Sequence, residues 1–320
     1  MRKEAGKMTR IYNYRVLTVL MAAVLAVVLT AFVAPSSQAA GKPDLMVPEA
    51  NLTSRNYVFS DEPSKFSFTD TTKNRGSATA GISKTLLALK RKLADRGDLI
   101  LATRDVPRLK PGGSDKGSGR DNRTPSKKQI GRYWAVVCAD ANFLIDESKE
   151  ANNCANTGKR LSIIPRSWTG SVTGSSPVVR GVTETWTAQQ MTFDFESEGS
   201  SFHYIAYGEV TYNVSGTDDF GCIWSGSGTS TLVNRGGLNL SNDFNFYEGW
   251  ADPLQPFYTI TRTCPNSPGI SHTGPWTSRW FNTGGLKNTT DSFGLTSLKG
   301  NYGFTESEGD VSYHWDLTAN

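Results

Sequence analysis

The sequence predicts an all-β protein with two domains behind an N-terminal export segment. Gly, Ser, Thr and aromatic residues are plentiful. Apolar residues alternate with polar ones in many short stretches, and no helical periodicity is sustained. The composition shifts at Trp168, because seven of the eight tryptophans lie at or beyond it while lysine and arginine become scarce. We therefore expect a signal peptide at residues 1–39, one domain at 42–165 and a second at 166–320.

The first 39 residues have the pattern of a secretory signal. Five basic residues precede or flank an apolar run from Val16 to Val33, and small residues ending at Ala39 offer a cleavage site. The run of about 18 residues is also long enough to stay in a bilayer as an uncleaved anchor, which is the alternative. In both cases we predict a secreted or cell-surface location, with membrane attachment only through an uncleaved segment.

Removing residues 1–39 leaves 29 basic and 29 acidic residues, which are unevenly distributed. Residues 40–165 hold 22 lysines and arginines against 14 acidic residues, a net charge of +8. Residues 166–320 hold 7 against 15, a net charge of −8. This asymmetry favours either docking between the domains or attraction of an anionic partner. The alternative is two solvated surfaces of opposite sign.

Four cysteines remain after the export segment. An even number in an oxidising compartment predicts disulfides, with three possible pairings. Each expected domain contains two, so Cys138–Cys154 and Cys222–Cys264 are the economical choice. Neither pair has the CxxC spacing of a zinc or redox site.

About seven short strands separated by turn signals predict an immunoglobulin-type β-sandwich for the first domain. Strands are expected at 65–71, 85–93, from Tyr133 onward and at 161–164. The stretch 114–128 is basic and lacks alternation, so we expect a loop there.

Residues 43–164 also carry a series of short motifs. In order, they are Pro43-Asp44-Leu45, Asn74-x-Gly76, Leu109-x-Pro111-Gly112, Gly131-x-Tyr133 with Ala139-Asp140, and Glu147-x-x-Glu150-x-Asn152-Asn153. Together they resemble the CARDB domain, the "cell adhesion related domain found in bacteria". The resemblance implies a seven-strand immunoglobulin-like sandwich in a bacterial surface or secreted protein, with an adhesion-related or accessory role.

The acidic loop after Cys138 suggests a calcium site. Asp140, Asn142 and Glu147 supply hard oxygen ligands, although Leu144 and Ile145 occupy positions that an EF-hand gives to a ligand and to the turn glycine. The alternative is that these side chains hydrogen-bond the backbone of the loop. We therefore predict no cofactor, with calcium as the single possibility held open.

The second domain reads as eight or nine antiparallel strands, which predicts either a barrel-like meander or a two-sheet sandwich. Strict alternation runs from Phe202 to Val214 and again from Val311 to Ala319. A phase slip at Gln189-Gln190 predicts a β-bulge. This half resembles no family.

Catalysis has little support. His314 and Asp316 share a strand face but no nucleophile motif accompanies them, and the spacing of carboxylates such as Glu184 and Glu209 cannot be derived from sequence. We therefore predict that the protein is not an enzyme.

Trp250, Trp276 and Trp280 lie near expected strand ends, where rings can stack on sugars or enter a protein partner; core packing is the alternative. We predict an exported, non-catalytic surface or extracellular protein with an adhesion or scaffold role. The second possibility is a carbohydrate- or small-ligand-binding protein that uses its aromatic-rich C-terminal half. Expected partners are a cell-surface or matrix polymer or a protein, and not nucleic acid.

Overall fold

The fold is nearly all β, as predicted. The computed structural model describes residues 41–92, 99–251, 257–267, 269–275 and 281–320, and these contain no α-helix. The strands are β1 (Leu45–Leu52), β2 (Tyr57–Phe59), β3 (Ser64–Asn74), β4 (Ser83–Lys90), β5 (Leu99–Val106), β6 (Ser114–Arg123), β7 (Gly131–Cys138), β8 (Cys154–Ile164), β9 (Ser167–Val179), β10 (Val182–Glu198), β11 (Ser201–Thr217), β12 (Ile223–Ser241), β13 (Phe246–Ala251), β14 (Phe257–Thr263), β15 (Ile270–Pro275), β16 (Lys287–Asn288), β17 (Ser297–Thr305) and β18 (Asp310–Ala319). Two single-turn 3-10 helices complete them, η1 (Lys127–Gln129) and η2 (Glu150–Asn152).

Strands β1 to β8 form a β-sandwich, which confirms the prediction for this half. One sheet has the order β1-β3-β6 and the other the order β2-β8-β7-β4-β5. Alternation along β3 turns Phe66 and Phe68 inward, and both are fully buried. They pack in one core with Tyr133, Leu161 and Ile163 of the facing sheet.

Strand β6 corrects the loop expected at 114–128. It pairs along its length with β3 at the edge of its sheet. Its buried position is Gly119, and a Cβ there would lie 2.2 Å from the ring of Phe68. The neighbouring strand's ring fills the space that an apolar side chain of β6 would occupy, so β6 shows no hydrophobic alternation.

The Asn74-x-Gly76 motif holds the first strand. The Asn74 side chain accepts hydrogen bonds from the amides of Asp44 and Gly76 and donates to the carbonyls of Ala78 and Leu109. Gly76 lies so close to the backbone that its Cβ would be 2.3 Å from the carbonyl oxygen of Lys42. An asparagine satisfies four backbone groups here, and only a glycine fits beside it.

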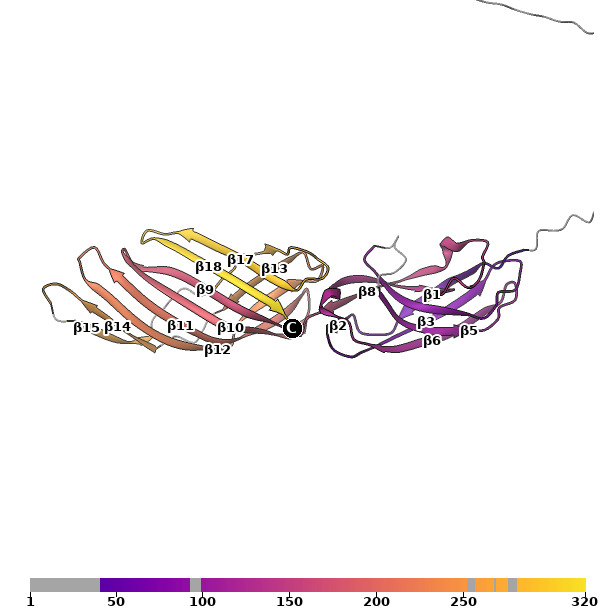
Figure 1. Cartoon of the computed structure of the whole chain (residues 1–320), viewed down its shortest axis with the longest axis horizontal. Helices are drawn as coiled ribbons and strands as arrows, with labels where there is room; N and C mark the ends of the chain where they lie inside the picture. Colours follow the sequence, from indigo (N-terminus) through magenta and orange to yellow (C-terminus); the bar gives the residue numbers. More distant parts are fainter. Residues whose placement is uncertain (1–40, 93–98, 252–256, 268, 276–280) are drawn as a thin grey trace, which may run out of the picture. The chain divides into compact units, whose positions relative to one another are not determined.

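Strands β9 to β18 form a second, larger sheet. Its main path is β15-β14-β12-β11-β10-β9-β18-β17, while β13 pairs with the C-terminal part of β12 and carries β16. Figure 1 shows β9 to β12 as long curved strands lying side by side. The predicted bulge at Gln189-Gln190 is confirmed by a register shift between Ala188 and Met191.

Each strand of this sheet has an inner and an outer face. Apart from Gly208 and Gly216, the even-numbered residues of β11, including Phe202, Tyr204 and Tyr212, are buried, and the odd-numbered ones are partly or fully exposed. Trp168 and Trp315 are fully buried in the same core as Tyr204. We call the side that carries these rings the inner face and the opposite side the outer face.

Both predicted cysteine pairs lie at disulfide distance, Cys138 with Cys154 and Cys222 with Cys264. Internal contacts divide the chain into residues 1–41 and 42–320. The predicted boundary near residue 165 falls between β8 and β9 and remains a prediction. The expected signal peptide lies outside the described residues, and no helix among the described residues has the length and hydropathy needed to cross a bilayer.

Candidate functional site

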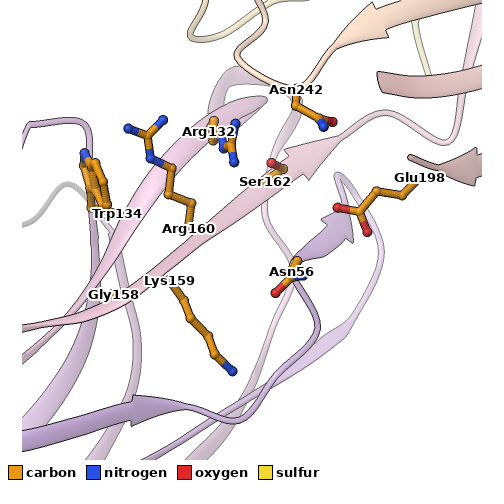
Figure 2. A pocket seen from close by; sticks show the side chains of 9 residues that line it. All are labelled: Asn56, Arg132, Trp134, Gly158, Lys159, Arg160, Ser162, Glu198 and Asn242. Carbon is orange, nitrogen blue, oxygen red and sulfur yellow. The ribbon is translucent and has the colours of Figure 1, made fainter. Parts of the chain in front are cut away.

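A basic cleft lies against the outward side of β7 and β8. It has a volume of about 480 Å³. Figure 2 shows its lining residues, which are Asn56, Arg132, Trp134, Gly158, Lys159, Arg160, Ser162, Glu198 and Asn242. Three cations and a single carboxylate give the cleft an excess of positive charge.

Strand pairing explains why these side chains gather. Trp134 lies opposite Arg160, and Arg132 lies opposite Ser162. The alternation that buries Tyr133 in the sandwich core turns Trp134 and Arg132 to the other side. A cross-strand pair on one face is close enough for direct contact.

The Arg160–Trp134 pair forms the most defined part of the cleft. The guanidinium carbon of Arg160 lies 3.9 Å from the centre of the Trp134 ring. Lys159 Nζ donates to the carbonyl of Leu52 at 3.0 Å. A stacked guanidinium keeps its planar N–H groups available, and that geometry suits carboxylate, phosphate or sulfate oxygens.

A second polar cluster surrounds Trp250 on the outer face of the large sheet. The rings of Trp250 and His203 are stacked at 6.0 Å. His203 Nδ1 is 2.7 Å from Asn239 Oδ1, its Nε2 is 3.5 Å from a Glu196 oxygen, and Asn239 donates to Glu248 at 3.0 Å. Trp250 is partly exposed, and a ring beside amide and carboxylate groups is suited to hydrogen-bonding and stacking on a sugar.

The structure places the predicted calcium ligands in separate roles. Both carboxylate oxygens of Asp140 accept amides of the following loop, from Leu144 and Ile145. Asn142 is exposed, whereas Glu147 is buried. Within the described ranges, no group of three or more His, Cys, Asp or Glu side chains could hold a metal ion. Asp140 thus does what an Asx side chain does in a turn, and the calcium site remains a prediction.

Glu147 anchors the first strand of the sandwich. One oxygen accepts the amide of Leu45 and the other accepts Asn153 Nδ2 at 2.9 Å. Burial raises the pKa of Glu147 to about 7, and these two hydrogen bonds only partly oppose the shift. Below about pH 7, the folded protein therefore favours the protonated form of the Glu147 carboxyl.

We expect the free energy of unfolding to fall as pH rises from the ordinary glutamate value of 4.5 toward 7, because the folded state retains a proton that the unfolded state has lost. The loss should be about 3 kcal/mol. Glu147→Gln should flatten this dependence, whereas Asp146→Asn, at an exposed neighbour, should keep it. Urea unfolding at pH 5 and pH 8 measures both. A slope that persists in Glu147→Gln would assign the effect to another group.

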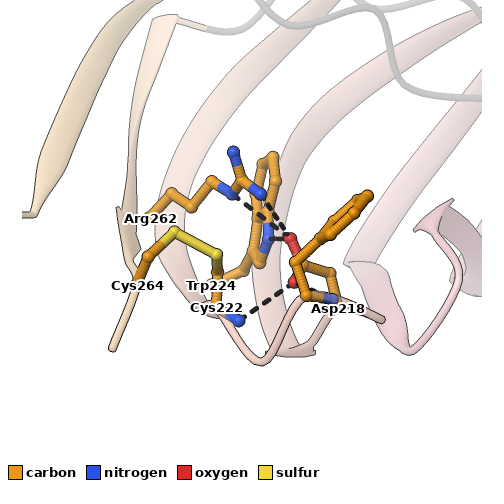
Figure 3. Close-up of a disulfide and its surroundings, with 6 residues drawn as sticks. Asp218, Cys222, Trp224, Arg262 and Cys264 are labelled. Atoms are coloured by element: carbon orange, nitrogen blue, oxygen red, sulfur yellow. Dashed lines mark hydrogen bonds and ion pairs between the residues drawn. A yellow bond between two sulfur atoms is a disulfide. The ribbon is translucent and has the colours of Figure 1, made fainter. Parts of the chain in front are cut away.

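The disulfide of the large sheet belongs to a structural hub at the β11–β12 turn. Figure 3 shows Asp218 accepting hydrogen bonds from Trp224 Nε1 at 2.9 Å, from Arg262 at 2.9 Å and from the amide of Cys222 at 3.0 Å. The Trp224 hydrogen bond is the main reason that the pKa of Asp218 falls to about 2. Cys222–Cys264 then links the turn to β14. These residues hold the β11–β12 turn and the end of β14 together.

The sequence identified only part of these sites. Trp250 lies in the outer cluster and is partly exposed, and its role in ligand binding remains a prediction; Trp276 and Trp280 lie outside the described residues. The cleft residues Arg132 and Arg160 were not predicted individually. Their signal was present in the excess of basic charge before residue 165 and in their alternation with buried positions.

Comparisons with known proteins found a family match in residues 42–157. Residues 42–157 match the CARDB family, which confirms the resemblance in this part of the chain. A crystal structure of the CARDB domain of a Pyrococcus furiosus protein in complex with di-metal ions is 22% identical, and the alignment covers 38% of this chain and 90% of that one with a TM-score of 0.26. A solution NMR structure of that domain is 18% identical, with coverages of 38% and 95% and a TM-score of 0.24. No curated protein matches the chain.

Proposed function

We propose that this protein is an exported, non-catalytic adhesion or scaffold protein that holds an anionic polymer of the cell exterior in its basic cleft. The observation that carries the proposal is the stacked Arg160–Trp134 pair beside Arg132 and Lys159. The match of residues 42–157 to an adhesion-related family supports the role. Two disulfides support a location outside the cytoplasm, where such bonds persist.

Charge reversal in the cleft tests this function. Arg132→Glu with Arg160→Glu should weaken binding to polygalacturonate about tenfold or more, because both lost cations face the polymer. Affinity electrophoresis of the full chain at low and moderate salt measures the effect, and wild-type binding should fall with salt. Lys116→Glu with Arg120→Glu makes the same charge change on exposed β6. If the two double variants weakened binding equally, the polymer would be held by nonspecific charge attraction and not by the cleft.

Carbohydrate binding is a second candidate function, favoured by the stack of Trp250 on His203 beside Asn239 and Glu248. Trp250→Ala should abolish retention on a glycan array and the accompanying change in tryptophan fluorescence, because the stacking ring is gone. Phe220→Ala is the matched control, since that ring is 82% exposed at the far turn. Failure of every glycan to bind the wild-type chain would contradict this candidate.

A further inference from the structure

The outer face of the large sheet carries a regular array of small polar side chains. Two adjacent rows cross β10, β11 and β12 in register, Thr187–Thr211–Thr229 and Thr185–Asn213–Ser227. We call these six residues the hydroxyl grid. All are exposed except Thr187, which is partly exposed. Neighbouring strands lie about 4.8 Å apart and alternate residues about 7 Å apart, so hydroxyl and amide groups recur at fixed intervals.

The rows continue into a groove on the same face. It has a volume of about 460 Å³ and is lined by Thr173, Gly174, Ser175, Trp186, Asn301, Ser312, Tyr313 and His314 together with Thr185 and Thr187 of the grid. The hydroxyls of Ser175 and Ser312 lie 2.9 Å apart across β9 and β18. Thr173 and Thr187 form one wall of the groove, and Ser175 and Thr185 form the other. The row between them, which includes Trp186, turns its side chains to the inner face.

The absence of charged side chains from the grid and the groove favours a neutral partner. None of the groove residues or the grid residues is Lys, Arg, Asp or Glu. The half of the chain that bears them, residues 166–320, has a net charge of −8, which repels a polyanion. A hydroxyl both donates and accepts, so rows of hydroxyls complement the hydroxyls of a neutral sugar in either orientation.

The twist of the sheet favours a flexible polymer chain over a flat crystalline surface as the binding partner. Adjacent strands rotate by about 20–25°, so a flat crystal face would lose register after a few strands. A single polymer chain can follow the twist. Replacing one hydrogen bond to water by one to a sugar hydroxyl contributes little binding free energy. Binding therefore depends on many such contacts made at once along the polymer.

Trp250 extends this surface. It lies opposite Gly237, which in turn lies opposite Ile205, an odd-numbered residue of β11. Trp250 is therefore on the same outer face as Thr211 and Asn213. An aromatic platform and the hydroxyl grid share one side of one sheet.

We propose that the hydroxyl grid and its groove bind a single extended chain of a neutral polysaccharide across β9 to β12. This deepens the carbohydrate-binding candidate and rests on it. The grid supplies length-dependent hydrogen bonding, and Trp250 supplies a stacking contact elsewhere on the same face, at the level of Ile205 in β11.

Affinity electrophoresis of the full chain in gels containing hydroxyethyl cellulose tests the proposal. Wild-type protein should be retarded, with cellohexaose competing about tenfold or more weakly per sugar than the polymer. Thr187→Val, Thr211→Val and Thr229→Val combined should reduce the retardation about tenfold or more, because valine keeps the shape and strand preference but removes the hydroxyl. The control is Thr69→Val, Thr71→Val and Thr103→Val on sandwich strands β3 and β5, which should retain full retardation.

The outcomes separate this inference from the function on which it rests. If Trp250→Ala lost retardation while the grid variant kept it, carbohydrate binding would remain supported and the grid would be overturned. Equal loss in the grid and control variants would overturn it too, as would binding to crystalline cellulose without binding to the soluble chain. No retardation of wild-type protein would overturn the grid, and carbohydrate binding would fall with it only if every glycan on the array also failed to bind.

Discussion

Replacing Arg104 by methionine is expected to destabilise the protein by about 3–5 kcal/mol, because it leaves a buried carboxylate without its partner. Arg104 Nε and Nη2 donate to the two oxygens of Asp70 at 2.5 Å and 2.9 Å, and Nη1 donates to Asp115 at 2.5 Å. The Asp70 side chain is 0% exposed. Thr72 donates to the same carboxylate at 2.8 Å and cannot neutralise it. Urea unfolding monitored by circular dichroism measures the loss.

Two further variants make this prediction specific. Lys84→Met breaks the ion pair with Asp105, whose side chains are 46% and 78% exposed, and should cost less than about 1 kcal/mol. Adding Asp70→Leu to Arg104→Met should restore much of the stability, since the orphaned charge is then gone. If Arg104→Met alone had the same urea midpoint as the wild-type protein, Asp70 would not be left as a buried, unpaired charge in the variant.

Reduction of the two disulfides is the second large effect. The pairs are separated by 16 and 42 residues, and loop closure in the unfolded chain makes them worth about 3 and about 4 kcal/mol. Each loss should lower Tm by roughly 6–10 °C. Scanning calorimetry of Cys138→Ser/Cys154→Ser and of Cys222→Ser/Cys264→Ser measures them separately.

EDTA is the comparison for the first disulfide, because the same loop holds the predicted calcium ligands. Asp140 and Glu147 are hydrogen-bonded to protein groups, so we expect EDTA to leave Tm within about 1 °C while reduction lowers it by several degrees. A larger shift with EDTA than with reducing agent would restore calcium as the element that orders this loop.

The sequence predicted the β class, the cysteine pairs and several individual faces. The alternation noted from Phe202 to Val214 is present in the structure, where Tyr204 and Tyr212 are buried and His203 is partly exposed. The pairing of Cys138 with Cys154 followed from having two cysteines in each expected half. These succeeded because alternation is local, since the strand period depends only on residues two apart.

Prediction failed where neighbouring strands supply what a segment lacks. The 114–128 stretch shows no alternation because Phe68, a residue of β3, fills the space above Gly119. Glu147, one of the candidate ligands, accepts a hydrogen bond from Leu45, which lies 102 positions away and was not indicated by the sequence. A linear pattern carries no record of such a partner.

The sequence by itself therefore determined what the alternating strands turn inward, how the cysteines divide and which family residues 42–157 match. Only the tertiary structure decided which outward residues stand together. Arg160 meets Trp134, and Thr187, Thr211 and Thr229 fall into one row, through the register between strands. Register is set by long-range pairing and bulges, and a shift of one residue would move every side chain to the other face. Both proposed binding surfaces depend on that register.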